Sequence, residues 1–238
     1  MHNVATDDDA ADFDRFFAET SRDESKRVAE SYFTRDCLWI VERAQASPDT
    51  FPGIAALVLL SIQQPFVQMP RQIADVAQDG AESQWLFGYK SAGFDFVRRN
   101  KRALWESARA CHAGKISLDD LILDYLAIPN MGIVKASFLA QMTVGQGACL
   151  DTLNLRTMGL SETAFRTPKA LKPVSIRKRI ATYNAAWRAH GDSAYWWDSW
   201  CDLVGNRTHN VRGYKIGGFA NGSEVSHVHR LAITGGIK

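Results

Sequence analysis

The sequence lacks an apolar run long enough to cross a membrane as a helix. Its longest candidate, residues 54–62, contains Ser61, whereas a membrane helix needs roughly 18 or more apolar residues. The acidic start, residues 1–14, also lacks the basic end and apolar stretch of a signal peptide. We therefore expect a cytoplasmic protein with no signal peptide and no membrane contact, in a compartment where disulfides are rare.

Cysteine is sparse, and its spacing excludes a compact cluster. The four cysteines lie far apart, at Cys37, Cys111, Cys149 and Cys201. An iron–sulfur cluster needs closely spaced cysteine ligands. We therefore predict no cluster and no other cofactor, and we interpret the thiols as buried apolar residues.

A zinc motif is also missing. The tail contains His209, Glu224, His227 and His229, but no cysteine pair and no helical His-Glu spacing accompanies them. The sequence therefore predicts no metal site, and we interpret His227 and His229 as surface or phosphate-contacting residues.

The chain has little net charge, but the charge is unevenly distributed. The formal net charge is +2, and residues 1–36 contain ten acids and five bases, which leaves +7 on the remainder. Residues 166–188 contain seven bases and no acid. Such asymmetry is typical of a surface that meets phosphate, although a solvated helix face has the same composition.

Helical periodicity dominates the sequence, and alternating segments are few. This pattern predicts an all-α protein, with loops or a short β hairpin in the glycine-containing tail after residue 205. The expected helices cover residues 12–31, a short segment through 39, 54–63, 70–78, 92–113, 117–126, 132–143, 151–158, 174–190 and 193–204. Ser117 and Ser193 are the expected N-caps of two of them.

The segment Leu121–Arg156 carries the most functional information. It reads as an apolar helix, a tight turn over Ile128-Pro129-Asn130-Met131-Gly132, a second apolar helix and Asp151 at the start of a third. Such a turn presents amide N–H groups at a helix start, where the helix dipole favours an anion. A DNA phosphate fits this chemistry, and a ligand-free helical hairpin has the same local pattern.

The turn resembles the helix-hairpin-helix of the endonuclease III and 8-oxoguanine DNA glycosylase superfamily. The family form is Leu-Pro-Gly-Val-Gly-x-Lys-x-Ala, and residues 128–136 read Ile-Pro-Asn-Met-Gly-Ile-Val-Lys-Ala. The later Val-Asp-Thr-His-x-x-Arg motif resembles Leu-Asp-Thr-Leu-Asn-Leu-Arg at 150–156. Upstream, Leu59-Leu60-Ser61-Ile62-Gln63-Gln64 is similar to the Leu-Leu-Ser-x-Gln segment, and 100–103 to a Lys-Ala helix start.

The resemblance implies a two-lobed helix-hairpin-helix fold that holds duplex DNA between its lobes. The expected organisation is a flexible acidic start at 1–12, N-terminal helices at 13–48, a helical lobe at 49–150 and a C-terminal lobe at 151–238. The N-terminal helices are expected to pack with the C-terminal lobe. The resemblance also implies DNA contacts from five residues of the hairpin: Pro129, Asn130, Met131, Gly132 and Val134.

The lysine of the hairpin departs from the family pattern by one position. Lyase-competent relatives place their catalytic lysine where this chain has Val134, and Lys135 follows one residue later. A helix turns about 100° per residue, so this shift normally aims the amine elsewhere. Either Lys135 still reaches the sugar, or the enzyme removes bases with water alone. Leu153 also replaces the histidine of the family motif.

Asp151 is the expected catalytic carboxylate. Cleavage of an N-glycosidic bond builds positive charge on the sugar, and a fixed carboxylate stabilises that charge and orients the nucleophile. An Asp before Thr152 is also a good helix N-cap, and the two roles can coexist. If the amine of Lys135 attacks the sugar, it forms a Schiff base and permits strand cleavage.

A base-excising enzyme must also extrude its target base. Gln63, with Gln64 as its neighbour, resembles the residue that family members insert into the gap. Two aromatic groups are suited to stacking, Trp85-Phe87-Tyr89 and Tyr195-Trp196-Trp197-Trp200, and most of the second group is expected in the core.

The sequence thus predicts a monomeric DNA glycosylase of base excision repair, with Asp151 and Lys135 as its catalytic residues. AP-lyase activity depends on whether Lys135 reaches the sugar. An enzyme of DNA hypermodification and a non-catalytic DNA-binding protein remain alternatives. The sequence does not identify the base.

Overall fold

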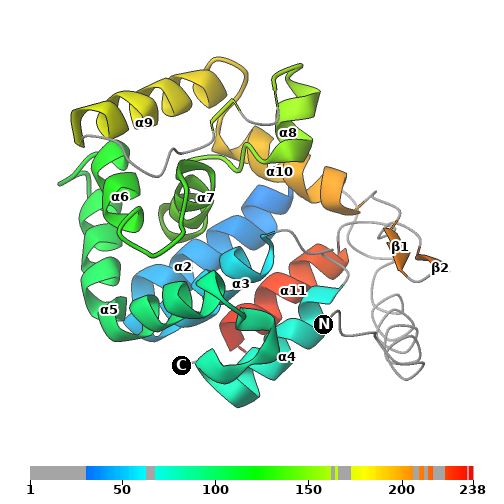
Figure 1. Cartoon of the computed structure of the whole chain (residues 1–238). Helices are drawn as coiled ribbons and strands as arrows, with labels where there is room; N and C mark the ends of the chain where they lie inside the picture. The colour runs from blue at the N-terminus through cyan, green and yellow to red at the C-terminus, as the bar shows by residue number, and fades with distance from the viewer. Residues whose placement is uncertain are drawn as a thin grey trace.

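The computed structural model of this chain describes residues 31–62, 68–161, 164–165, 173–205, 209–211, 214–216, 223–234 and 236–237. These residues form an all-α arrangement with one pair of short strands (Figure 1). The α-helices are α2 (Leu38–Ala46), α3 (Phe51–Leu60), α4 (Met69–Asp79), α5 (Tyr89–His112), α6 (Leu118–Tyr125), α7 (Ile133–Val144), α8 (Thr152–Thr157), α9 (Pro173–Arg188), α10 (Ser193–Gly205) and α11 (Ser223–Thr234).

Short turns of other helix types connect several of these elements. A π-helix, η2 (Phe33–Cys37), leads into α2, and the 3₁₀ turn η3 (Pro48–Thr50) leads into α3. Two further 3₁₀ turns, η5 (Gly80–Glu82) and η6 (Gln84–Leu86), lie between α4 and α5. In the tail, β1 (His209–Val211) pairs antiparallel with β2 (Tyr214–Ile216), where loops or a hairpin were predicted.

Helix α3 forms the centre of the molecule. All ten of its residues are buried, and it contacts α4, α5, α7 and α11 (Figure 1). Its sequence has no charged or polar side chain, and Pro52 lies in the first turn, where the missing amide costs no hydrogen bond. The hydrophobic effect therefore favours covering this helix on every side.

Helix α11 corrects the sequence prediction for the tail. Residues 223–234 were expected in loops or a hairpin, but they form a helix that packs on α3 and α4. Val228, His229 and Ala232 are buried there. The backbone approach to α3 is close, since a Cβ on Gly53 would lie 1.9 Å from the carbonyl oxygen of Ala232. Packing on a distant helix stabilises α11, and local periodicity does not report such contacts.

Helix α2 departs from the prediction of a short segment through 39, because it continues to Ala46. The other described helices agree with the predicted ranges to within about three residues. Helix α6 begins as expected, because Ser117 Oγ accepts a hydrogen bond from the Asp120 amide (3.1 Å). The expected Ser193 cap is wrong: the Tyr195 amide donates to Asp192 Oδ1 (2.8 Å), and Ser193 Oγ bonds the backbone of Gly147. Most of the predicted helix at 12–31 lies outside the described residues.

None of the helices in the described ranges is long and apolar enough to cross a membrane. The division into lobes at residues 12, 48 and 150 stays a prediction.

Candidate functional site

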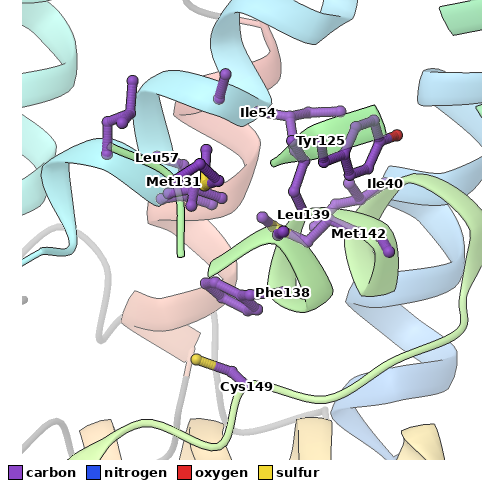
Figure 2. Close-up of a cluster of buried hydrophobic side chains, with 14 of the residues drawn as sticks. Ile40, Ile54, Leu57, Tyr125, Met131, Phe138, Leu139, Met142 and Cys149 are labelled. Atoms are coloured by element: carbon purple, nitrogen blue, oxygen red, sulfur yellow. The ribbon is translucent and has the colours of Figure 1, made fainter. Parts of the chain in front are cut away.

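The turn between α6 and α7 is held in place by two of its own side chains, which are buried in the core. Ile128 and Met131 are buried, and the Met131 amide donates to the Ile128 carbonyl (3.0 Å). Figure 2 shows Met131 in one apolar cluster with residues of α3, α6 and α7. Asn130 has a φ of 63°, the left-handed geometry that asparagine tolerates better than most residues. Met131 thus closes and anchors the turn.

Helix α5 supports the turn from outside the hairpin. Asn130 Nδ2 donates to the Tyr89 carbonyl (3.4 Å) at the start of α5. One helical turn later, a Cβ on Gly93 would lie 3.0 Å from the Pro129 carbonyl oxygen and 3.3 Å from Leu59 Cδ2. Glycine at position 93 therefore allows the hairpin, α5 and α3 to meet in one place.

Helix α7 begins directly after the turn. Gly132 is its N-cap residue and contributes no side-chain cap. The first intrahelical bond runs from the Ala136 amide to the Gly132 carbonyl (2.9 Å), so the amides of Val134 and Lys135 precede the helical ladder. The positive end of the helix dipole thus lies at this turn. Val134 is half-buried and packs on the core.

The one-residue shift from Val134 to Lys135 directs the lysine amine toward α3. Lys135 Nζ donates to Ser61 Oγ (3.1 Å) just past the end of α3 and lies 4.0 Å from Cys149 Sγ. The ammonium also lies 5.3 Å from the centre of the Phe138 ring. Lys135 is half-buried. It therefore connects the segment around Ser61 with the link that precedes Asp151.

Asp151 has both of its carboxylate oxygens in hydrogen bonds. Oδ1 accepts from the Asn154 amide (3.2 Å), which is the N-cap interaction of α8. Oδ2 accepts from the indole Nε1 of Trp200 (3.2 Å), a buried residue of α10. The sequence singled out Trp200 as a core residue, and its contact with the carboxylate was not foreseen.

The link before Asp151 is held by buried side chains. Tyr183 on α9 donates its hydroxyl to the Ala148 carbonyl (2.6 Å) and accepts from the Leu150 amide (3.0 Å). Asn154 Nδ2 donates to the Cys149 carbonyl (2.7 Å). These bonds fix the backbone on both sides of Cys149, so Asp151 occupies one defined position.

Cys149 lies between the two predicted catalytic residues. Its thiol is buried, and burial raises its pKa to about 12, with a further upward contribution from Asp151 and an opposing one from Lys135. The thiol is therefore neutral at physiological pH and does not compete for the lysine proton. The Lys135 amine lies 4.0 Å from this thiol, and Asp151 follows Cys149 by two residues.

A second lysine, which no sequence pattern indicated, reaches the end of α3. Lys90 on α5 is 1% exposed, and its Nζ donates to the Ile62 carbonyl (2.9 Å). The ammonium lies 5.3 Å from the centre of the Phe87 ring. Burial, with a smaller contribution from the positive charge of Lys135, lowers the pKa of Lys90 to about 8.

Other predicted contact residues lie outside this cluster or outside the described ranges. Gln63 and Gln64 fall in the segment 63–67, which is not described. Phe87 and Tyr89 are exposed near the turn. Tyr195 is exposed on α10, whereas Trp196, Trp197 and Trp200 are buried as expected.

The interpretation of His229 as a surface or phosphate-contacting residue is wrong. Its side chain is 1% exposed and lies against the rings of Trp197 and Trp200, with centroid distances of 5.0 and 5.9 Å. Burial lowers its pKa to about 4 despite an opposing influence of Asp36. His229 is therefore a neutral core residue at physiological pH. The side chain of His227 lies outside the described part of the molecule.

Among the described side chains, no group of three or more His, Cys, Asp or Glu residues is arranged to hold a metal ion. Comparison of the chain with protein-family models, curated proteins and solved structures finds no match. The functional argument therefore rests on the hairpin and on the cluster around Lys135 and Asp151.

Proposed function

We propose that this protein is a DNA N-glycosylase of the two-lobed helix-hairpin-helix type, which removes a damaged or modified base from duplex DNA. The supporting observation is the contact of Lys135 Nζ with Ser61 Oγ (3.1 Å) and Cys149 Sγ (4.0 Å). The amine of the hairpin lysine thus contacts Ser61, within the Leu-Leu-Ser segment, and Cys149, which directly precedes the Leu-Asp-Thr segment. A hairpin without catalytic function does not require this convergence.

In the proposed reaction, the hairpin binds a DNA phosphate and the target base leaves the helix stack. The bond between the base and C1′ then breaks, and positive charge develops on the sugar. Asp151 stabilises that charge with a carboxylate that Trp200 and the Asn154 amide already orient. Lys135 supplies the amine that attacks C1′ and forms a Schiff base, which gives the enzyme its AP-lyase step.

The first experiment measures base release from duplexes that contain uracil, 8-oxoguanine, 5-hydroxymethyluracil or an alkylated base, and strand cleavage of a duplex that contains an abasic site. Borohydride is included to trap a Schiff base. We expect release of at least one base and trapping on the abasic duplex. Salt-sensitive binding without release of any base contradicts the glycosylase proposal and favours a non-catalytic DNA-binding protein. Trapping that survives Lys135→Ala assigns the Schiff base to another amine.

The substitution Asp151→Asn separates the two roles of Asp151. Asparagine caps helices as well as aspartate does, so the free energy of unfolding should change by less than about 1 kcal/mol. Base release should fall by a factor of roughly 100 or more, because the neutral amide does not stabilise a developing cation. Urea denaturation and single-turnover base release measure the two effects. Full base release by the asparagine variant rules out the catalytic role.

A further inference from the structure

Two exposed aromatic side chains lie beside the hairpin, where the chain enters α5. Phe87 is 54% exposed and Tyr89 is 37% exposed. Surface turns are normally built from small or polar residues, and large apolar groups that gather at a surface mark an interaction site. Neither ring is part of the buried core, and neither takes part in the proposed reaction. Contact with a ligand would explain why both aromatic rings lie at the surface.

The backbone that carries the two rings forms a tight turn. The Lys90 amide donates to the Phe87 carbonyl (3.3 Å). Between them, Gly88 has a φ of 59° and a ψ of −121°, which is the geometry of the first central residue in a type II′ turn. Glycine is the residue that adopts this conformation readily. The turn therefore holds the backbone of Phe87 and Tyr89 in one arrangement.

Two contacts hold this turn against the rest of the molecule. The buried Lys90 ammonium donates to the Ile62 carbonyl (2.9 Å), just past the end of α3, and lies 5.3 Å from the centre of the Phe87 ring. Asn130 Nδ2 of the hairpin donates to the Tyr89 carbonyl (3.4 Å). The backbone beneath the rings is thus ordered before a ligand arrives, which lowers the entropic cost of binding.

The surroundings of the rings favour a nucleotide as the ligand. The bond from Asn130 joins Tyr89 to the turn that begins α7, where amide N–H groups and the helix dipole attract a phosphate. The other part of a nucleotide is a flat base, which stacks on aromatic rings whatever its sequence. An apolar protein surface would suit the rings but not the amides of the neighbouring turn. The two features together therefore match the two parts of one DNA strand.

We propose that Phe87 and Tyr89 form an aromatic platform that stacks on an unstacked base of DNA, next to the phosphate that the hairpin binds. This inference rests on the proposed function for the identity of the partner as DNA. In a paired duplex the faces of each base are covered by its neighbours, so the platform acts only on a base that has left the stack. It replaces part of the stacking that such a base loses.

The experiment measures binding to two duplexes of the same sequence, one fully paired and one with a single unpaired adenine. Stacking of one base on an aromatic ring changes affinity by about tenfold, so the wild type should prefer the second duplex by about that factor. Phe87→Ala and Tyr89→Ala should each lose most of this preference and bind the paired duplex as the wild type does. Both side chains are exposed, so the variants should fold, which circular dichroism checks.

Ring-retaining variants separate stacking from a structural role. Phe87→Tyr and Tyr89→Phe keep a flat ring and should keep the preference for the unpaired base. Phe87→Leu keeps an apolar side chain without a flat ring and should lose it. Leu38→Ala removes an apolar side chain of comparable exposure, 44%, from α2 and should behave as the wild type. Damage to the hairpin would instead lower the affinity for both duplexes by the same factor.

The outcomes separate this inference from the glycosylase proposal. A preference that the alanine variants lose and the ring-retaining variants keep supports the platform, even if no tested base is released. Equal binding of the two duplexes by the wild type, or an unchanged preference in both alanine variants, overturns the platform even if a base is released. Self-association that Phe87→Ala abolishes assigns the rings to a second copy of the chain and also overturns it. A wild type that binds neither duplex overturns both proposals.

Discussion

Asp151 is oriented by a side chain that also belongs to the core. The indole N–H of Trp200 bonds Asp151 Oδ2, while its ring packs against Phe138 at a centroid distance of 4.9 Å. Phe138 in turn lies beneath the ammonium of Lys135. The pair of Trp200 and Phe138 thus supports both proposed catalytic residues. A change in the packing of this pair would displace both of them.

The substitution Trp200→Phe should lower activity more than its effect on stability suggests. Phenylalanine keeps most of the ring packing but removes the donor to the carboxylate, so base release should fall by roughly tenfold or more. Trp196→Phe is the control, because it removes an equally buried indole donor to the Trp187 carbonyl. Each variant should lose about 1 kcal/mol of unfolding free energy. Equal base release by the two variants would show that Trp200 does not orient Asp151.

The hairpin depends on the close packing of helices as well as on its own turn. Gly93 of α5 lies against the Pro129 carbonyl and the Leu59 side chain. Loss of that contact would let the turn move relative to α3. The hydrogen bond between Lys135 and Ser61, at the end of α3, would then be disturbed. The packing of α5 therefore fixes the position of the proposed phosphate-binding turn relative to the proposed catalytic residues.

The substitution Gly93→Ala should lower the free energy of unfolding, although alanine usually stabilises a helix relative to glycine. Alanine in a helix interior normally stabilises by about 1 kcal/mol over glycine, but overpacking at this site costs about 1–3 kcal/mol. We expect a net loss of unfolding free energy, measured by urea denaturation, together with weaker binding to duplex DNA. Ala92→Gly, at the exposed neighbouring position, calibrates the helix preference. A more stable Gly93→Ala protein would disprove the close contact.

Local sequence signals predicted the hairpin and its helices because those features depend on nearby residues. The Ser117 cap and the left-handed Asn130 are decided within a few positions of the chain. Helix α11, the Trp200–Asp151 bond and the buried Lys90 depend on partners far away in sequence. A lysine at the start of an amphipathic helix normally faces water, so no local pattern distinguishes Lys90 from an exposed lysine.

His229 connects the stability of the molecule to pH. The folded pKa of about 4 lies below the ordinary value of 6.5, so between these values the unfolded chain binds more protons than the folded one. The free energy of unfolding should therefore fall as the pH drops from about 6.5 to 4, by up to about 3 kcal/mol from this residue. Asp36 is the charged group that acts on the ring and partly offsets the effect.

Urea denaturation at pH 7, 6 and 5 measures this dependence. His229→Gln should be less stable than the wild type at pH 7, because the ring packing with Trp197 and Trp200 is lost. Its stability should also change less between pH 7 and 5. His112→Gln removes an exposed histidine at the end of α5 and should keep the wild-type slope. Parallel pH profiles for wild type and His229→Gln would contradict the assignment.

The contact between Gly53 of α3 and Ala232 of α11 joins residues made at very different times on the ribosome. Helix α11 begins more than 160 residues after α3 ends, and synthesis proceeds at about 5–20 residues per second. The most apolar of the described helices therefore waits roughly 8–30 seconds for the helix that covers one of its sides. During that interval the nascent chain presents a surface suited to chaperones, and the amides of α3 should gain full protection from hydrogen exchange only after α11 has docked.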